Sequence, residues 1–148
     1  MEQRTILIVD DDVIIRETLR DVFESKGYVV ETSETAKEAL EKSEARTFNI
    51  ALLDIKLPDM EGTELLKKMH SIAPRTMKIM ITASGTLKNA MDSLNFGADA
   101  YLLKPIDQNQ LLKTVEEKLR EQYTADAMSE DEVAKWIEAR LQKLRKTQ

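Results

Sequence analysis

The chain has 148 residues, 42% of them hydrophobic and 33% charged, which is enough for one domain with a helical appendage. It has no cysteine, and this excludes disulfides, thiolate metal sites and thiol catalysis. The net charge of −5 comes without a basic patch, no apolar run could span a bilayer, and no signal peptide is recognisable. We therefore expect a cytoplasmic protein that contacts neither nucleic acid nor membrane.

Five short apolar runs predict the strands of a sheet. In chain order they are Ile6–Val9, Tyr28–Val30, Ile50–Leu53, Ile79–Ile81 and Ala100–Leu103. The runs are too short for helices, and four of them are too uniformly apolar for strands that expose one face. They are typical of strands buried on both faces of a parallel sheet. Tyr28–Val30 is the weakest run, and we expect it near an edge of the sheet.

Amphipathic stretches follow each of these runs. Apolar residues recur at helical spacing within 15–23, 39–40, 65–69, 90–94 and 111–119. Capping-box spacing marks the start of two helices, at Thr35 and at Asp107. Gly27 and Gly97 stand where helices should end before the next strand. Five strand–helix units in strict alternation predict an α/β fold with a doubly wound parallel sheet.

Polar side chains follow the predicted strands at the points where the strands end. They are Asp10, Asp11 and Asp12, then Asp54, Thr82 and Lys104. The carboxyl ends of the strands meet at the edge of such a sheet where ligands bind. Clustered carboxylates there would repel one another unless a cation neutralised them, and a hard oxygen site of this kind suits Mg²⁺.

The same edge also offers what a transferred phosphoryl group needs. A hydroxyl and a lysine, here Thr82 and Lys104, can bind its equatorial oxygens. A carboxylate such as Asp54 can act as the nucleophile and form an acyl phosphate. The set therefore predicts phosphoryl transfer onto an aspartate.

Four segments that carry these residues resemble the receiver domains of two-component signalling proteins. They are Ile6–Asp12, Leu53–Gly62, Ile81–Ala83 and Tyr101–Pro105. The resemblance covers residues from about 4 to 121 and so implies a receiver domain over 1–122, followed by a helical extension over 123–148. It also implies the flavodoxin-like (βα)5 fold with strand order 2-1-3-4-5.

The resemblance assigns a role to each matching acidic residue. Asp54 is similar to the phosphoacceptor of the family. Asp11 corresponds to a direct Mg²⁺ ligand, and Asp10 to a residue that holds the metal largely through water. Asp54 and the backbone carbonyl of Lys56 would complete the protein part of the metal shell.

The remaining matches imply a switch. Thr82 would donate a hydrogen bond to one phosphoryl oxygen, and Lys104 would pair with another. Tyr101 matches the aromatic residue that turns inward on activation, and the Lys104–Pro105 bond is usually cis in this family. The implied function is a phosphorylation-controlled signalling switch rather than an enzyme. A histidine kinase or a histidine phosphotransfer protein would supply the phosphoryl group, and the domain would assist its own phosphotransfer and dephosphorylation.

Other interpretations stay open at this point. The three aspartates at 10–12 could be the acidic start of a helix, and Tyr101 could be an ordinary core aromatic residue. An aspartate-based phosphatase of another fold would carry a second aspartate where this chain has Lys56. A dinucleotide or flavin carrier would need a Gly-x-Gly loop, which this chain lacks. A receiver that only binds partners would not need the complete acidic set.

The C-terminal segment predicts one more helix. Ser129 and Glu132 have capping-box spacing, and one apolar stripe follows. The stripe consists of Val133, Trp136, Ile137, Leu141 and Leu144. It could fold back on its own receiver domain, lead into a further domain, or pair with another subunit. We favour a homodimer formed through this helix. The segment is too short for a second active site or a helix-turn-helix domain.

Overall fold

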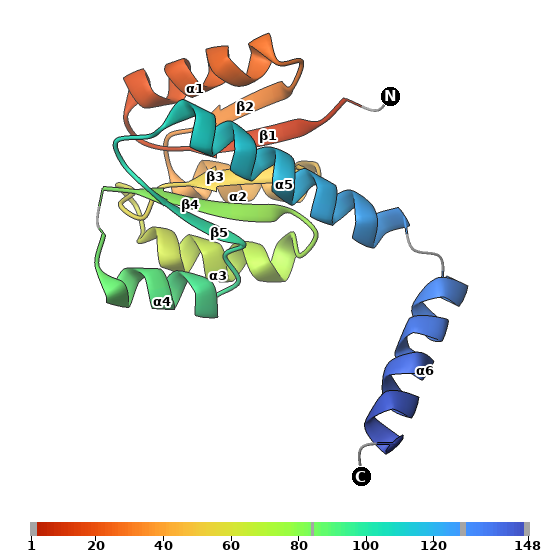
Figure 1. Cartoon of the computed structure of the whole chain (residues 1–148). Helices are drawn as coiled ribbons and strands as arrows, with labels where there is room; N and C mark the ends of the chain where they lie inside the picture. The colour runs from red at the N-terminus through yellow and green to blue at the C-terminus, as the bar shows by residue number, and fades with distance from the viewer. Residues whose placement is uncertain (1–2, 84, 128–129, 147–148) are drawn as a thin grey trace.

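The computed structural model describes residues 3–83, 85–127 and 130–146. It contains one parallel sheet of five strands, in the order β2-β1-β3-β4-β5, which confirms the predicted fold and topology (Figure 1). The strands are β1 (Thr5–Val9), β2 (Val29–Ser33), β3 (Ile50–Leu53), β4 (Met77–Thr82) and β5 (Ala100–Leu103). The helices are α1 (Val13–Ser25), α2 (Ala36–Ala45), α3 (Gly62–Ile72), α4 (Leu87–Asn95), α5 (Gln108–Ala127) and α6 (Glu130–Lys146).

Two apolar cores lie on the two faces of the sheet. In β1, Ile6 and Ile8 join the core beneath α1 and α5, whereas Leu7 and Val9 join the core beneath α2 and α3. Successive side chains of a strand point to opposite faces. A strand that is covered on both faces is apolar at successive positions, and this is why the runs in β1, β3 and β4 show no alternation. The run in β5 was also expected to be buried on both faces, but its residues are only partly buried and Leu103 is 53% exposed, because β5 is an edge strand.

The edge strand β2 differs from its prediction. It ends at Ser33 rather than at Val30, and its last three residues are polar. Tyr28 lies before the strand and packs edge-on against Phe23, with the ring centroids 5.6 Å apart. A strand with a neighbour on one side only is covered less completely, so polar residues are tolerated there and the apolar signal fades.

The helix ends follow the predicted signals. The Thr35 hydroxyl accepts a hydrogen bond from the Glu38 backbone amide (3.2 Å) at the start of α2. Gly27 and Gly97 have φ angles of 91° and 100°, a left-handed conformation that glycine adopts without a steric penalty. The Lys104–Pro105 bond is cis, as the resemblance implied. Among the described residues, no helix combines the length and the apolar character needed to cross a bilayer.

A buried glutamine ties the far part of α5 to the amino-terminal end of the sheet. The Gln122 side chain donates hydrogen bonds to the backbone carbonyls of Asn49 (3.1 Å) and Arg75 (2.7 Å). It also accepts one from the Asn49 side-chain amide (2.9 Å). The helix continues to Ala127, so the predicted boundary at residue 122 falls inside α5. The division into two domains stays a prediction.

The extra C-terminal helix is present as α6, and Figure 1 places it off the sheet. The apolar side chains that the structure describes on it, Trp136, Ile137, Leu141 and Leu144, are 46% to 63% exposed. Folding back on the receiver domain, one of the predicted alternatives, is thus not what the structure shows. Ser129, the predicted cap, lies outside the described residues.

Candidate functional site at the carboxyl edge of the sheet

Two aspartates stand side by side because the hydrogen-bonding ladder continues past the strand ends. The Asp10 amide donates to the Ser33 carbonyl (3.1 Å), and the Asp54 amide donates to the Val9 carbonyl (3.0 Å). Carboxylate oxygens of Asp10, Asp11 and Asp54 lie within 4.8 Å of one another. Asp10 and Asp54 are only 4% and 7% exposed, whereas Asp11 is exposed to solvent. The structure therefore brings these three acids together, and their roles in the site stay a prediction.

Asp12 does not belong to this cluster. Its side chain accepts hydrogen bonds from the amides of Ile14 (2.9 Å) and Ile15 (3.3 Å), and it is the N-cap of α1. The helix-start interpretation is thus right for Asp12. It does not account for Asp10, whose Oδ1 accepts from the Asp12 amide (2.9 Å) while its Oδ2 faces Lys104.

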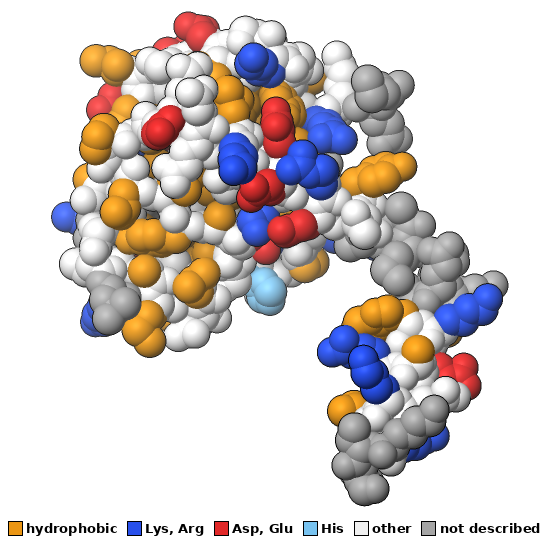
Figure 2. Space-filling view, viewed as in Figure 1, with side chains coloured by type: hydrophobic (Ala, Val, Ile, Leu, Met, Phe, Trp, Pro, Cys, Tyr) orange, Lys and Arg blue, Asp and Glu red, His pale blue; other side chains and the backbone are white. Residues whose placement is uncertain are grey.

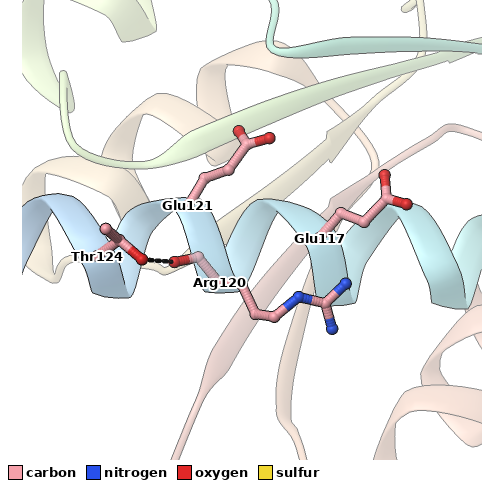
Figure 3. A pocket seen from close by; sticks show the side chains of 4 residues that line it. All are labelled: Glu117, Arg120, Glu121 and Thr124. Atoms are coloured by element: carbon pink, nitrogen blue, oxygen red, sulfur yellow. Dashed lines mark hydrogen bonds between the residues drawn. The ribbon is translucent and has the colours of Figure 1, made fainter.

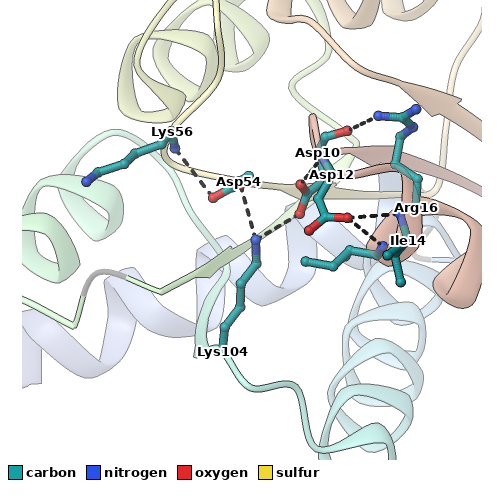
Figure 4. Close-up of polar contacts among 8 residues, drawn as sticks. Asp10, Asp12, Ile14, Arg16, Asp54, Lys56 and Lys104 are labelled. Atoms are coloured by element: carbon teal, nitrogen blue, oxygen red, sulfur yellow. Dashed lines mark hydrogen bonds and ion pairs between the residues drawn. The ribbon is translucent and has the colours of Figure 1, made fainter.

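Lys104 joins the two buried aspartates. Its backbone amide donates to the Thr82 carbonyl (2.8 Å), which places it directly after β5 on the same edge. Its Nζ lies 2.9 Å from Asp10 Oδ2 and 3.2 Å from Asp54 Oδ2 (Figure 4). Lys104 thus pairs with two of the three clustered carboxylates, and the cluster of Asp10, Asp11 and Asp54 keeps a negative charge that a divalent cation would balance. The donor set, all carboxylate oxygens, fits Mg²⁺.

Burial and neighbouring charges shift the pKa of both Asp54 and Lys104. Burial raises the pKa of Asp54, and the nearby Asp10 raises it further, while Lys104 partly opposes them. Burial by itself would lower the pKa of Lys104, but its hydrogen bonds and ion pairs with Asp10 and Asp54 outweigh that effect and raise the pKa. Lys104 is therefore held as a cation at the point where an anion would bind.

Thr82 and Tyr101 lie on one face of two neighbouring strands. Thr82 is buried at the end of β4 and pairs in register with Leu103, while Met80 pairs with Tyr101. Side chains alternate along a strand, so Thr82, Met80, Leu103 and Tyr101 all belong to the same face. Tyr101 is half-buried against the core beneath α2 and α3, and burial raises its pKa.

The loop after Asp54 is held by two contacts. Gly62 is buried where its missing Cβ would overlap the Asp54 carbonyl oxygen and the Ile55 Cα. Asp59 accepts hydrogen bonds from the backbone amides of Ala36 and Lys37, both at 2.9 Å. These two amides lower the pKa of Asp59. The loop is thereby tied to the start of α2.

Sequence reasoning did not single out Asp59 or Arg16. The Arg16 guanidinium donates to the Asp10 carbonyl (2.7 Å) from the second turn of α1 (Figure 4). A basic residue one turn into a helix that follows clustered acids was a usable signal for Arg16. Asp59 and Ala36 are 23 residues apart in the chain, and no local pattern predicts their contact.

Hollows in the described part of the chain include two that the three clustered aspartates do not line. One runs along α5 and is lined by Glu117, Arg120, Glu121 and Thr124 (Figure 3). The other is an apolar groove beside the site, between α1 and the segment after β5. Its lining is Ile14, Ile15, Thr18, Leu19, Val22, Lys104, Pro105, Ile106 and Gln108.

The chain belongs to the response regulator receiver domain family, whose model matches residues 6–116. It is similar to the transcriptional regulatory protein ZraR of Escherichia coli O157:H7, with 32% identity over 82% of this chain and 28% of that protein. It is also similar to the crystal structure of a CheY-like receiver domain protein from Methanospirillum hungatei JF-1, with 50% identity, a TM-score of 0.82, and coverage of 84% of this chain and 99% of that one. A response regulator from Burkholderia pseudomallei, solved with a phosphorylated aspartic acid and a calcium ion, is 25% identical, with a TM-score of 0.74 over 84% of this chain and 74% of that one.

These relatives settle the class and correct one expectation. The protein contains the receiver domain of a two-component response regulator, a signalling switch and not an enzyme in the usual sense. The chain spans less than a third of the ZraR protein that it matches. Because that relative is named as a transcriptional regulator, the expected absence of nucleic-acid contact is not supported for the whole protein. The net charge of −5, on which that expectation rested, describes this chain alone.

Proposed function

We propose that Asp54 accepts a phosphoryl group from the phosphohistidine of a sensor kinase or a phosphotransfer protein. A carboxylate oxygen of Asp54 forms the new bond to phosphorus as the bond from phosphorus to the imidazole nitrogen breaks. The observation that carries the proposal is the position of Lys104 Nζ, within 3.2 Å of both Asp54 and Asp10. A phosphoryl group on Asp54 would meet this cation without a large movement of the protein.

Mg²⁺ is the metal that we propose for the site. Asp10, Asp11, Asp54 and the backbone carbonyl of Lys56 would hold it, and the metal would neutralise charge that develops on the phosphoryl oxygens. The support is the convergence of three carboxylates within 4.8 Å around one lysine. Lys104 and Thr82 would then bind the phosphoryl oxygens that the metal does not contact.

The apolar groove beside the site suits the phosphodonor. Ile14 and Val13 are exposed large apolar residues at the start of α1, and Ile14 lines the groove next to Lys104. An apolar surface within reach of the phosphoacceptor would let a helix of the donor pack there. Histidine and aspartate would then be brought together by contacts that lie outside the reacting groups.

A mass measurement tests the phosphoacceptor. The full chain, incubated with acetyl phosphate and Mg²⁺, should gain the mass of one phosphoryl group, and a chelator should prevent the gain. Asp54→Asn should abolish it, whereas Asp21→Asn, a matched change on an exposed residue of α1, should not. Asp11→Asn should raise the Mg²⁺ concentration needed for half-maximal labelling. An adduct formed at full yield by Asp54→Asn would refute the assignment.

We also propose that phosphorylation shifts the packing around Thr82 and Tyr101. Thr82 would move toward the phosphoryl group, and Tyr101, on the same face two residue pairs away in the register of β4 and β5, would occupy the vacated space. This is a change in population between two packings, and the surface it alters is that of α4, β5 and α5. Met91, Leu94 and Leu103 are exposed apolar residues on that surface and suit a partner that binds one of the two states.

Amide chemical shifts check the switch. Adding beryllofluoride and Mg²⁺ to the full chain should move resonances between residues 82 and 107 as well as those next to Asp54. Asp54→Asn should remove both sets of changes. Shifts that stay within the immediate neighbourhood of Asp54 would show that the site does not communicate with β5.

A further inference from the structure

The C-terminal helix α6 has an apolar face that the described residues leave exposed to solvent. Four side chains of α6 are about half exposed or more: Trp136, Ile137, Leu141 and Leu144. Figure 2 shows apolar side chains on this helix, away from the body of the domain. A helix of 17 residues is marginal in water by itself, and an amphipathic helix gains most of its stability by packing its apolar face.

The receiver domain does not supply the cover. Helices already cover both faces of its sheet, and the four side chains of α6 stay about half exposed or more in the structure. Figure 1 shows α6 beyond the end of α5 and pointing away from the sheet. A second copy of this chain, by contrast, brings an apolar face of equal length.

The charges at the ends of α6 determine the orientation of such a pair. The first turn begins with three acids, residues 130–132, and the last turn contains three bases, Lys143, Arg145 and Lys146. A parallel pair would place three acids against three acids and three bases against three bases. An antiparallel pair would place the acidic end of each helix against the basic end of the other, which is favourable at contact distance.

A charged residue within the apolar face leads to the same orientation. Arg140 is one helical turn after Trp136 and Ile137, and its guanidinium stacks over the Trp136 ring at 5.1 Å. In a parallel pair in register, Arg140 would face the same arginine of the other copy. In an antiparallel pair, Arg140 lies opposite Ile137, and Val133 lies opposite Leu144, when the two helices are centred between residues 138 and 139.

We propose that α6 forms an antiparallel pair with α6 of a second copy and so makes this chain a homodimer. The contact would place apolar residues in the middle and opposite charges at both ends. It is independent of the phosphorylation site, because none of its residues comes from the receiver core.

Light scattering on the full chain tests the association. The chain should show twice the monomer mass. Each Ile137→Glu substitution should raise the dissociation constant of the dimer by about tenfold, so the two substitutions in one dimer should raise it by about a hundredfold. Gln142→Glu, on the opposite side of the same helix, is the matched control and should leave the dimer intact. A full chain that stays monomeric at high concentration would overturn the proposal. So would a dimer that Ile137→Glu does not weaken.

Single cysteines test the orientation, since the chain has none of its own. We expect Val133→Cys mixed with Leu144→Cys to form a mixed disulfide dimer under mild oxidation, identified by its intact mass. Each variant alone should remain largely uncrosslinked. Efficient crosslinking of Leu144→Cys with itself, and no mixed species in the mixture, would show a parallel pair and refute the antiparallel arrangement.

Discussion

Replacing Lys104 with methionine is expected to slow the phosphorylation of Asp54 by acetyl phosphate by about 100-fold to 1,000-fold. The Lys104 ammonium lies 3.2 Å from Asp54 and would meet the charge that develops on the phosphoryl oxygens. Removing one such preorganised donor typically costs that factor in rate. The rate of mass gain at saturating Mg²⁺ measures it. Lys113→Met, which removes an exposed lysine of α5, should leave the rate unchanged.

The same variant should be less stable when no metal is present. Lys104 is the cation paired with two buried carboxylates, Asp10 and Asp54, and removing one partner of a buried pair costs about 3 kcal/mol or more. Burial and Asp10 already raise the pKa of Asp54, and loss of Lys104 would raise it further. A carboxyl whose pKa is higher in the folded than in the unfolded state lowers the free energy of unfolding when the pH lies above the folded-state pKa. This loss disappears as the pH falls through that pKa, because the carboxyl becomes neutral in the folded state. Urea unfolding at pH 7 and at pH 4.5 should therefore show a smaller difference from wild type at the lower pH. Equal stability of the two proteins at pH 7 would contradict the role of Lys104.

The second large effect is expected from Gly62→Ala. The added Cβ would overlap the Asp54 carbonyl oxygen and the Ile55 Cα, both of them backbone atoms that no side-chain rotation can move aside. Forcing a group into a well-packed site costs about 1 to 3 kcal/mol, and the upper end applies where the obstacle is backbone. We therefore expect a loss of about 3 kcal/mol in the free energy of unfolding, together with slower phosphorylation, because the strain acts directly on the phosphoacceptor.

Gly85→Ala is the control for that change. The nearest atom to a Cβ at Gly85 is a Leu103 side-chain methyl group at 3.4 Å, an ordinary contact that the leucine can adjust. In urea unfolding, the two variants should have the same m value, and Gly62→Ala should have a clearly lower midpoint urea concentration than Gly85→Ala. If Gly62→Ala unfolds at the same urea concentration as Gly85→Ala, the close approach at Gly62 does not constrain the loop.

The sequence predicted the fold and the acidic site well because both depend on local signals. Uniformly apolar runs indicated the strands, of which β1, β3 and β4 are buried on both faces, and the polar residues after four of the runs identified the edge where ligands bind. Asp10, Asp11, Asp54 and Lys104 were found in this way, and the structure brings them together. The edge strand was found only in part, since Glu31, Thr32 and Ser33 carry no apolar signal at a position that tolerates polar residues.

What the sequence did not reveal is long-range polar contact. Asp59 reaches the start of α2, and Gln122 reaches Asn49 across 73 residues. Both side chains belong to residue types that are common on surfaces, and nothing in their neighbours distinguishes a buried partner from a solvated one. The apolar stripe of α5 does not mark where the helix ends, because the residues after Gln122 continue the helix without continuing the stripe.

The path of α5 limits how α6 can respond to phosphorylation of Asp54. The helix begins three residues after Pro105, beside the phosphoacceptor, and Gln122 fastens it at the opposite end of the sheet. Helix α5 is also held along its length, because Leu111, Val115 and Leu119 are buried in the core beneath it. In Figure 1, α6 lies beyond the end of α5 and off the sheet. A change in the direction of α5 would therefore change the direction in which the chain leaves the receiver domain, and two copies joined through α6 would show it as a change in the separation of their receiver domains.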